Sequence, residues 1–167
     1  AGLEIVNEKE PKAAAGPTAR STPNASTRPR APPLNHAKIN VDAAVRIGRG
    51  GSAAVVCRDS NGNYLGSSAI VVQGVDDPTS LETMTCREAL CTAEDLLLQQ
   101  FVVASDAKQV VDDIQQGSRG KHAAIIKEIV ARSISFSCNF VYKSRNNNVE
   151  AHKLARFALN LAPGRHV

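Results

Sequence analysis

The order of hydrophobic periods along the chain restricts its fold more than any other feature of the sequence. Between residues 37 and 72, three segments show the two-residue alternation of β-strands, and short turns containing glycine or Asn-Gly separate them. From residue 76 on, helical segments alternate with strand-like segments as far as residue 162. Strands joined by short turns pair antiparallel, whereas strands joined through helices pair parallel. The sequence therefore predicts an α/β protein with a single mixed sheet.

Five strands and four helices are expected, in the order β-β-β-α-β-α-α-β-α. The first helix has the clearest start, because Pro78 precedes it and Thr79 and Glu82 match a capping box. The strand at 100–105, "QFVVAS", is apolar on both faces and is therefore expected in the sheet centre, with helices on both faces of the sheet. The other strands are expected at 37–45, 53–59, 64–72 and 133–143, and the helices at 76–100, 106–117, 121–133 and 149–162.

The N-terminal residues differ in composition from the rest of the chain. The stretch "PKAAAGPTARSTPNASTRPRAPP" is rich in Pro, Ala, Ser, Thr and Arg and has no apolar period. Such a segment buries too little apolar surface to offset the entropy lost on ordering. We therefore expect a disordered linker at 1–36, a folded domain at 37–162 and a short tail at 163–167. The linker would join a further domain to the folded one.

Several features of the sequence bear on where the protein works. No apolar run approaches the roughly 20 residues that a membrane span needs, and the chain does not begin with a secretion signal pattern. The four cysteines show no C-x-x-C spacing, which favours reduced thiols over disulfides or a zinc site. We therefore expect no membrane association and a reducing compartment, nucleus or cytoplasm, rather than secretion. The cysteines are Cys57, Cys86, Cys91 and Cys138.

Charge is distributed unevenly along the chain. Residues 37–116 carry six Lys or Arg against eleven Asp or Glu, whereas residues 117–167 carry nine against two. One interpretation is a carboxylate site beside a surface that attracts phosphates. The other is an ordinary mixed surface, and charge alone does not separate the two.

Three carboxylates stand where a sheet of this order can bring them together. Asp42 lies in the middle of the first strand, in "KINVDAAV", although Asp is disfavoured in strands. Asp106 follows the strand at 100–105, at the carboxyl end where open α/β sheets place their sites. Glu82 lies near the start of the first helix. Each has a structural alternative: an edge or bulge residue for Asp42, an N-cap for Asp106 and half of a capping box for Glu82.

Taken together, the segments resemble the ribonuclease H superfamily over residues 38 to about 160. "KINVDAAV", "LETMTCREAL", "VVASDAKQVV" and "NNNVEAHKLARFA" are similar to its four motifs, in the correct order. "KINVD", "VVCRDSNGNYLG" and "EAHKLA" most resemble the plant ribonuclease-H-like domains related to retroelement reverse transcriptases. The resemblance implies a ribonuclease H-like fold, which is a five-stranded mixed sheet of three antiparallel and then two parallel strands with helices on both faces.

The resemblance also implies a metal site and a reaction. Asp42, Glu82 and Asp106 would bind Mg²⁺ or Mn²⁺, with Asp42 shared between two ions. Two divalent ions about 4 Å apart activate the attacking water and stabilise the leaving oxygen of a phosphodiester. Glu82 would also lie near the 2′-hydroxyl of the cleaved strand, the group that distinguishes RNA from DNA.

The fourth motif departs from the pattern of the superfamily at His152, where many members have Asp. A neutral imidazole is a poorer Mg²⁺ ligand than a carboxylate and suits Mn²⁺ or Zn²⁺ better. We therefore expect His152 to be a weak fourth member of the site and the second ion to bind less tightly. His152 has two alternative roles, as a group that moves protons or orients water, and as an exposed residue in the first turn of a helix.

Other departures concern the contacts with nucleic acid. The segment "DDPTSLE" lacks the Asn that members gripping a hybrid often have, which leaves Thr79 and Ser80 as hydrogen-bond donors. Lys108 replaces a Gln and would meet a phosphate as a point charge. Ala43 replaces a frequent Gly and still permits close approach of a phosphate. Arg145 and Asn148, in "KSRNNNVE", complete the set of expected nucleic-acid-binding residues.

Two functions of different classes follow. The first is a metal-dependent endonuclease that hydrolyses the RNA strand of RNA/DNA hybrids, with phosphates held by the basic C-terminal part, namely Lys143, Arg145, Lys153 and Arg156. The second is a catalytically weak or inactive module that keeps the fold and binds nucleic acid or protein. The three acids favour the first function, because clustered like charges are unfavourable unless something uses them. The departures at Lys108 and His152 and the missing Asn favour the second.

Overall fold

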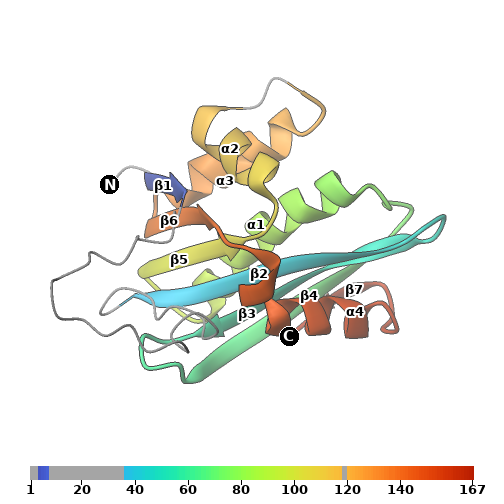
Figure 1. Cartoon of the computed structure of the whole chain (residues 1–167), viewed down its shortest axis with the longest axis horizontal. Coiled ribbons are helices and arrows are strands. Elements are labelled where there is room, and N and C mark those ends of the chain that lie inside the picture. Colours follow the sequence, from blue (N-terminus) through green and yellow to red (C-terminus); the bar gives the residue numbers. More distant parts are fainter. Residues whose placement is uncertain (1–3, 8–35, 118–119) are drawn as a thin grey trace, which may run out of the picture.

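A mixed seven-stranded sheet forms the centre of the computed structural model, which describes residues 4–7, 36–117 and 120–167. Four α-helices and one 3-10 turn complete the described elements (Figure 1). The helices are α1 (Pro78–Asp95), α2 (Lys108–Gln116), α3 (Ala123–Ser133) and α4 (Val149–Ala158), and the turn is η1 (Arg145–Asn147). The strands are β1 (Glu4–Asn7), β2 (Ala37–Arg46), β3 (Gly50–Arg58), β4 (Tyr64–Gln73), β5 (Gln100–Ser105), β6 (Ser137–Tyr142) and β7 (Gly164–His166).

The strand order is β1-β6-β5-β2-β3-β4-β7. Strands β2, β3 and β4 pair antiparallel, as expected for segments joined by short turns. Strands β2, β5 and β6 pair parallel, and helices supply the connections. The mixed sheet and the five expected strands are confirmed, and β5 lies between β2 and β6 as its apolar faces predicted.

The sheet has seven strands rather than five because a short strand is added at each edge. At one edge, β7 pairs antiparallel with β4 over residues Ala69 to Val71, so residues 164–166 of the tail expected at 163–167 are part of the sheet. A three-residue strand is too short to show a period, which is why the sequence did not reveal it. Arg165 holds β7 in place through ion pairs with Glu88 and Asp95 of α1.

At the other edge, β1 pairs parallel with β6 (Figure 1). Residues 4–7 were expected within the linker at 1–36 and instead form this edge strand. The remainder of that expected linker up to residue 35 lies outside the described residues.

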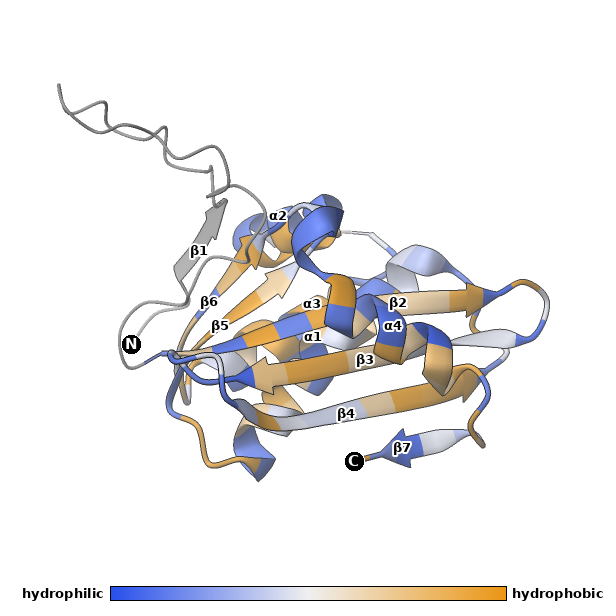
Figure 2. Ribbon diagram, turned by 60° about the horizontal axis from the view of Figure 1, so that its bottom comes forward, coloured by the Kyte–Doolittle hydropathy of each residue, from blue (hydrophilic) through white to orange (hydrophobic). Residues whose placement is uncertain are grey.

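Helices cover both faces of the sheet, as expected. In Figure 2, α4 lies in front of β2 and β3, and α1 lies on the opposite face. The main hydrophobic core fills the space between the sheet and α1, α2 and α3. It is composed mostly of Ile, Val, Leu and Ala, together with the ring pair Phe101 and Phe136, whose centroids are 5.1 Å apart. No helix in the described part of the chain is both long and apolar enough to cross a membrane.

The start of α1 differs from the expected capping box. Asp77, not Thr79, is the N-cap residue, and its Oδ2 accepts hydrogen bonds from the backbone N–H (3.0 Å) and the hydroxyl (2.6 Å) of Ser80. Asp is as good an N-cap as Thr, and Pro78 then occupies the first helical position, where its missing N–H is harmless. The side chain of Glu82 is consequently not needed at the cap.

Candidate metal centre

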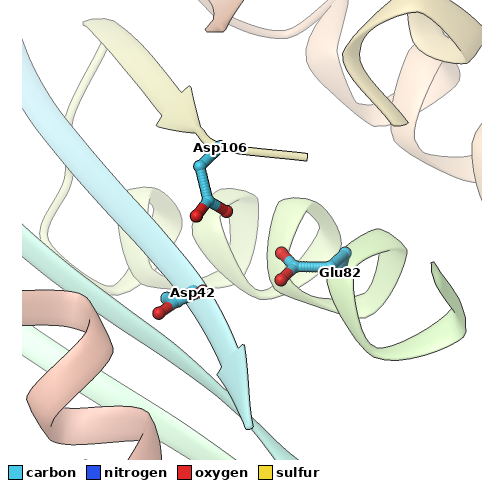
Figure 3. Close-up of side chains that lie close together, drawn as sticks. All are labelled: Asp42, Glu82 and Asp106. Atoms are coloured by element: carbon cyan, nitrogen blue, oxygen red, sulfur yellow. The ribbon is translucent and has the colours of Figure 1, made fainter. Parts of the chain in front are cut away.

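Three carboxylates from three separate elements converge at one end of the sheet. Asp42 lies in β2, Asp106 follows the last residue of β5, and Glu82 lies near the start of α1. One oxygen of each side chain lies within 4.8 Å of the others. Figure 3 shows the carboxylates of Glu82 and Asp106 pointing into the space beside Asp42. The convergence that the sequence predicted is therefore present.

Strand register explains why the two aspartates meet. The last residues paired between the parallel strands β2 and β5 are Asn40 and Ala104. Asp42 and Asp106 each lie two residues further on, and side chains two residues apart share a face of the sheet. Glu82 reaches the same place because α1 packs across β2 and β3.

Burial and mutual repulsion perturb the ionisation of the cluster. Burial, followed by the charges of Asp42 and Asp106, raises the pKa of Glu82 to about 8. Burial also raises the pKa of Asp42, against the effect of its hydrogen bond with His152, and the charge of Asp106 adds to the increase. Without a cation, the cluster is therefore unfavourable in its fully ionised form.

The donor atoms fit a hard divalent cation. Mg²⁺ and Mn²⁺ prefer carboxylate and water oxygens, and the cluster offers carboxylate oxygens alone. The Oε2 atom of Glu82 is buried and has no hydrogen-bond partner among the described residues. A buried, unpaired carboxylate oxygen is unfavourable unless a ligand uses it. These residues therefore fit a divalent metal.

His152 reaches the site as a partner of Asp42 rather than as one of the three clustered groups. Its Nδ1 lies 2.8 Å from Asp42 Oδ2, and its side chain is 43% exposed. Helix α4 brings it there, because Asn148 at the start of this helix donates a hydrogen bond from Nδ2 to the Val41 carbonyl at 2.6 Å. Asn148 is buried, with 3% of its surface exposed, and its side chain joins α4 to β2, while its contact with nucleic acid stays a prediction.

The remaining expected nucleic-acid-binding residues take different positions around the cluster. The side chain of Arg145 approaches the cluster, with Nε 3.5 Å from Asp106 Oδ2, and is 84% exposed. Lys108 is exposed at the first position of α2. The backbone N–H of Ala43 donates to Asp42 Oδ1 at 2.9 Å and so helps to orient that carboxylate.

Thr79 and Ser80 lie in the first turn of α1 and are half-buried. The Ser80 hydroxyl donates to Asp77, and the Thr79 carbonyl accepts a hydrogen bond from the Thr83 hydroxyl. Ser80 is therefore occupied at the helix cap. Sequence reasoning missed the roles of Asp77 and Asn148. For Asp77 the usable signal was its place directly before a helix, where Asp is favoured, whereas the side chain of Asn148 makes no cap hydrogen bond and its bond to Val41 has no local signal.

Known structures share this architecture. RNase H1 from the halophilic archaeon Halobacterium salinarum has a TM-score of 0.64 at 16% identity, over 76% of this chain and 99% of that one. The N-terminal RNase H domain of a Mycobacterium tuberculosis protein, solved as a fusion with maltose-binding protein, has a TM-score of 0.65 at 20% identity, over 75% and 94%. LC11-RNase H1, isolated from compost and solved with an RNA/DNA hybrid, has a TM-score of 0.59 at 17% identity, over 74% and 96%.

At these identities the similarity of the structures shows the fold, which is that of RNase H. No curated protein matches this chain in sequence. The model of the family described as "Reverse transcriptase-like" does match, over residues 40–158, a range that contains the three carboxylates and His152. The chain therefore belongs to the reverse transcriptase-like family and contains an RNase H-like domain.

Proposed function

We propose that this domain is a metal-dependent endonuclease of the RNase H type, which hydrolyses the RNA strand of RNA/DNA hybrids. One observation carries the proposal: Asp42, Glu82 and Asp106, far apart in the sequence, place carboxylate oxygens within 4.8 Å of one another. The fold adds support, because a protein of similar architecture was solved with an RNA/DNA hybrid.

Asp42, Glu82 and Asp106 would hold Mg²⁺ or Mn²⁺ in this proposal. When bound, divalent ions supply an activated water and stabilise the leaving oxygen of a phosphodiester. We propose a two-metal site in which the second ion binds more weakly. The second ion is expected to bind weakly because His152 is neutral when it acts as a ligand, and a neutral imidazole is a poorer Mg²⁺ ligand than a carboxylate. In addition, the His152 Nδ1 atom is already engaged 2.8 Å from Asp42 Oδ2.

The other residues of the site bind and orient. His152 holds Asp42 through its ring nitrogen and has the second ring nitrogen available to orient a water or move a proton. Glu82 is proposed to face the 2′-hydroxyl of the RNA strand. Arg145, Lys153 and Arg156 are exposed cations of the basic C-terminal part and would contact phosphates, whereas Lys143 is buried. Hybrid affinity should therefore fall steeply as the salt concentration rises.

A second candidate is a catalytically weak module that binds nucleic acid or protein. The hydrogen bonds of Ser80 and Asn148 favour it, because both side chains are occupied within the fold and leave fewer groups to contact sugars. A retroelement-related plant origin, a nuclear or cytoplasmic location and a further domain joined through the N-terminal linker also belong to the proposal. The four cysteines are free thiols, which fits a reducing compartment.

Cleavage of a labelled RNA/DNA hybrid in Mg²⁺ and in Mn²⁺ distinguishes the two candidates. We expect the wild type to cut the hybrid only in the presence of metal. The cleavage rate should fall at least about 100-fold in Asp42→Asn, which is the usual effect of removing one group that stabilises the transition state electrostatically. Asp112→Asn, the same substitution on α2 outside the cluster, should cut at the normal rate. Hybrid binding without cutting in either metal would instead establish the non-catalytic module.

A further inference from the structure

One exposed cation lies directly beside the carboxylate cluster. Arg145 Nε is 3.5 Å from Asp106 Oδ2, although 84% of the Arg145 side chain is accessible to solvent. The effect of Arg145 extends to Glu82. Burial is the main cause that raises the pKa of Glu82, and the charge of Arg145 acts in the opposite direction. The guanidinium therefore partly neutralises a cluster that otherwise consists only of acids.

The backbone of Arg145 is held at both ends by the strands that carry the two aspartates. On one side, the Lys143 N–H donates to the carbonyl of Ser105, the residue before Asp106, at 2.8 Å. On the other side, the Asn148 N–H donates to the Arg145 carbonyl at 3.1 Å, and the Asn148 side chain is bonded to β2. The backbone at Arg145 is thus placed firmly, whereas its long exposed side chain keeps rotamer freedom.

We propose that Arg145 is an internal counter-ion which competes with the divalent cation for Asp106, and which the cation releases to contact a backbone phosphate. A guanidinium 3.5 Å from a carboxylate oxygen repels a second cation approaching the same carboxylate. Once displaced, its planar fork of donors suits phosphate oxygens. The proposal rests on the proposed function, because it concerns the regulation of the same site.

The exchange couples two binding events. A cation that displaces Arg145 frees it to bind a phosphate and so raises the affinity for nucleic acid. By thermodynamic linkage, a phosphate that holds Arg145 away from Asp106 raises the affinity for the cation by the same factor. Arg145 therefore has opposite effects on the two ligands. It weakens binding of the metal alone and strengthens binding of nucleic acid.

Calorimetric titration of the metal-free protein with Mg²⁺ and Mn²⁺, without nucleic acid, tests the first effect. Because exposed ion pairs are weak, Arg145→Ala should lower the metal Kd by about two- to fivefold. Arg145→Lys, which keeps the charge but not the fork, should lie between Arg145→Ala and the wild type. Lys127→Ala removes an exposed charge from α3 and should leave the metal Kd unchanged.

Hybrid binding measured by fluorescence anisotropy tests the second effect, with Ca²⁺ or with EDTA in the buffer. Ca²⁺ serves as the hard-cation probe. For the wild type, Ca²⁺ should tighten hybrid binding, and Arg145→Ala should remove most of that gain. Losing one phosphate contact should also reduce the salt dependence of binding by about one ion.

An unchanged or raised metal Kd in Arg145→Ala would overturn the inference. Equal shifts in Arg145→Ala and Lys127→Ala would overturn it too, since they would indicate a general effect of net charge. Failure of the inference is distinguishable from failure of the proposed function. If the wild type binds metal and cuts hybrid while Arg145→Ala leaves the metal Kd unchanged, only the inference fails. If the wild type neither binds metal nor cuts, both fail.

Discussion

Replacing Glu82 by Gln should stabilise the metal-free protein, and more so at high pH. The pKa of Glu82 is about 8 in the folded protein, raised from 4.5 mainly by burial and then by the two aspartates. Between these two pH values the folded state binds more protons than the unfolded state. The free energy of unfolding therefore falls as pH rises from 4.5 towards 8. Gln does not ionise, so this loss disappears in Glu82→Gln.

The size of the effect follows from the displacement of the pKa. Each unit between folded and unfolded values corresponds to about 1.4 kcal/mol once the pH exceeds both. For Glu82 the loss is about 4 kcal/mol at pH 8 and about 1 kcal/mol at pH 5. Because Glu82 Oε2 is buried without a partner among the described residues, an amide there carries an offsetting penalty of about 1–3 kcal/mol at both pH values. The stability gained by Glu82→Gln should therefore be about 3 kcal/mol larger at pH 8 than at pH 5, because the penalty is the same at both pH values and cancels in the difference.

Urea unfolding of the wild type and Glu82→Gln at pH 5 and pH 8, with EDTA in both buffers, measures this difference. We expect Glu82→Gln to be more stable than the wild type at pH 8 and similar to it or slightly less stable at pH 5. Glu128→Gln, on the exposed face of α3, controls for the loss of one carboxylate. An equal stability change at both pH values in Glu82→Gln would refute the assignment of a buried, repelled carboxylate.

Three further substitutions test contacts that position the site and the sheet edge. Asn148→Ala removes the bond to the Val41 carbonyl and should lower the free energy of unfolding by about 1–3 kcal/mol; no change in urea unfolding would contradict the role of Asn148 in joining α4 to β2. Arg165→Ala leaves Glu88, which is only 2% exposed, without its cation and should lower stability by about 3 kcal/mol; adding Glu88→Gln should restore most of it, and a failure to do so would exclude the unpaired charge as the cause. Leu97→Gly should raise stability by about 1 kcal/mol in thermal unfolding, since Leu97 has a φ of 56° and an 84% exposed side chain; a loss of stability would show that the leucine makes a contact that offsets its backbone strain.

The sequence alone determined the five central strands, their pairing directions and the place of the two aspartates. Alternation over 37–72 and then helix–strand alternation leave few arrangements, because short turns force antiparallel pairing and helical crossovers give parallel pairing. Asp42 and Asp106 follow from this frame, since each stands at a countable distance along a strand. Glu82 follows less directly. Its sequence context also matched a capping box with Thr79, whereas in the structure the N-cap residue is Asp77.

Only the tertiary structure decided how the site is held and compensated. The bond from Asn148 to β2, the contact of His152 Nδ1 with Asp42 and the approach of Arg145 to Asp106 join residues about 40 to 110 positions apart. A local pattern reports periodicity and capping within a few residues and contains no information on such pairs. The edge strand β7 was hidden for a related reason, because its three residues gain their stability from β4 and from the ion pairs of Arg165 rather than from any preference of their own.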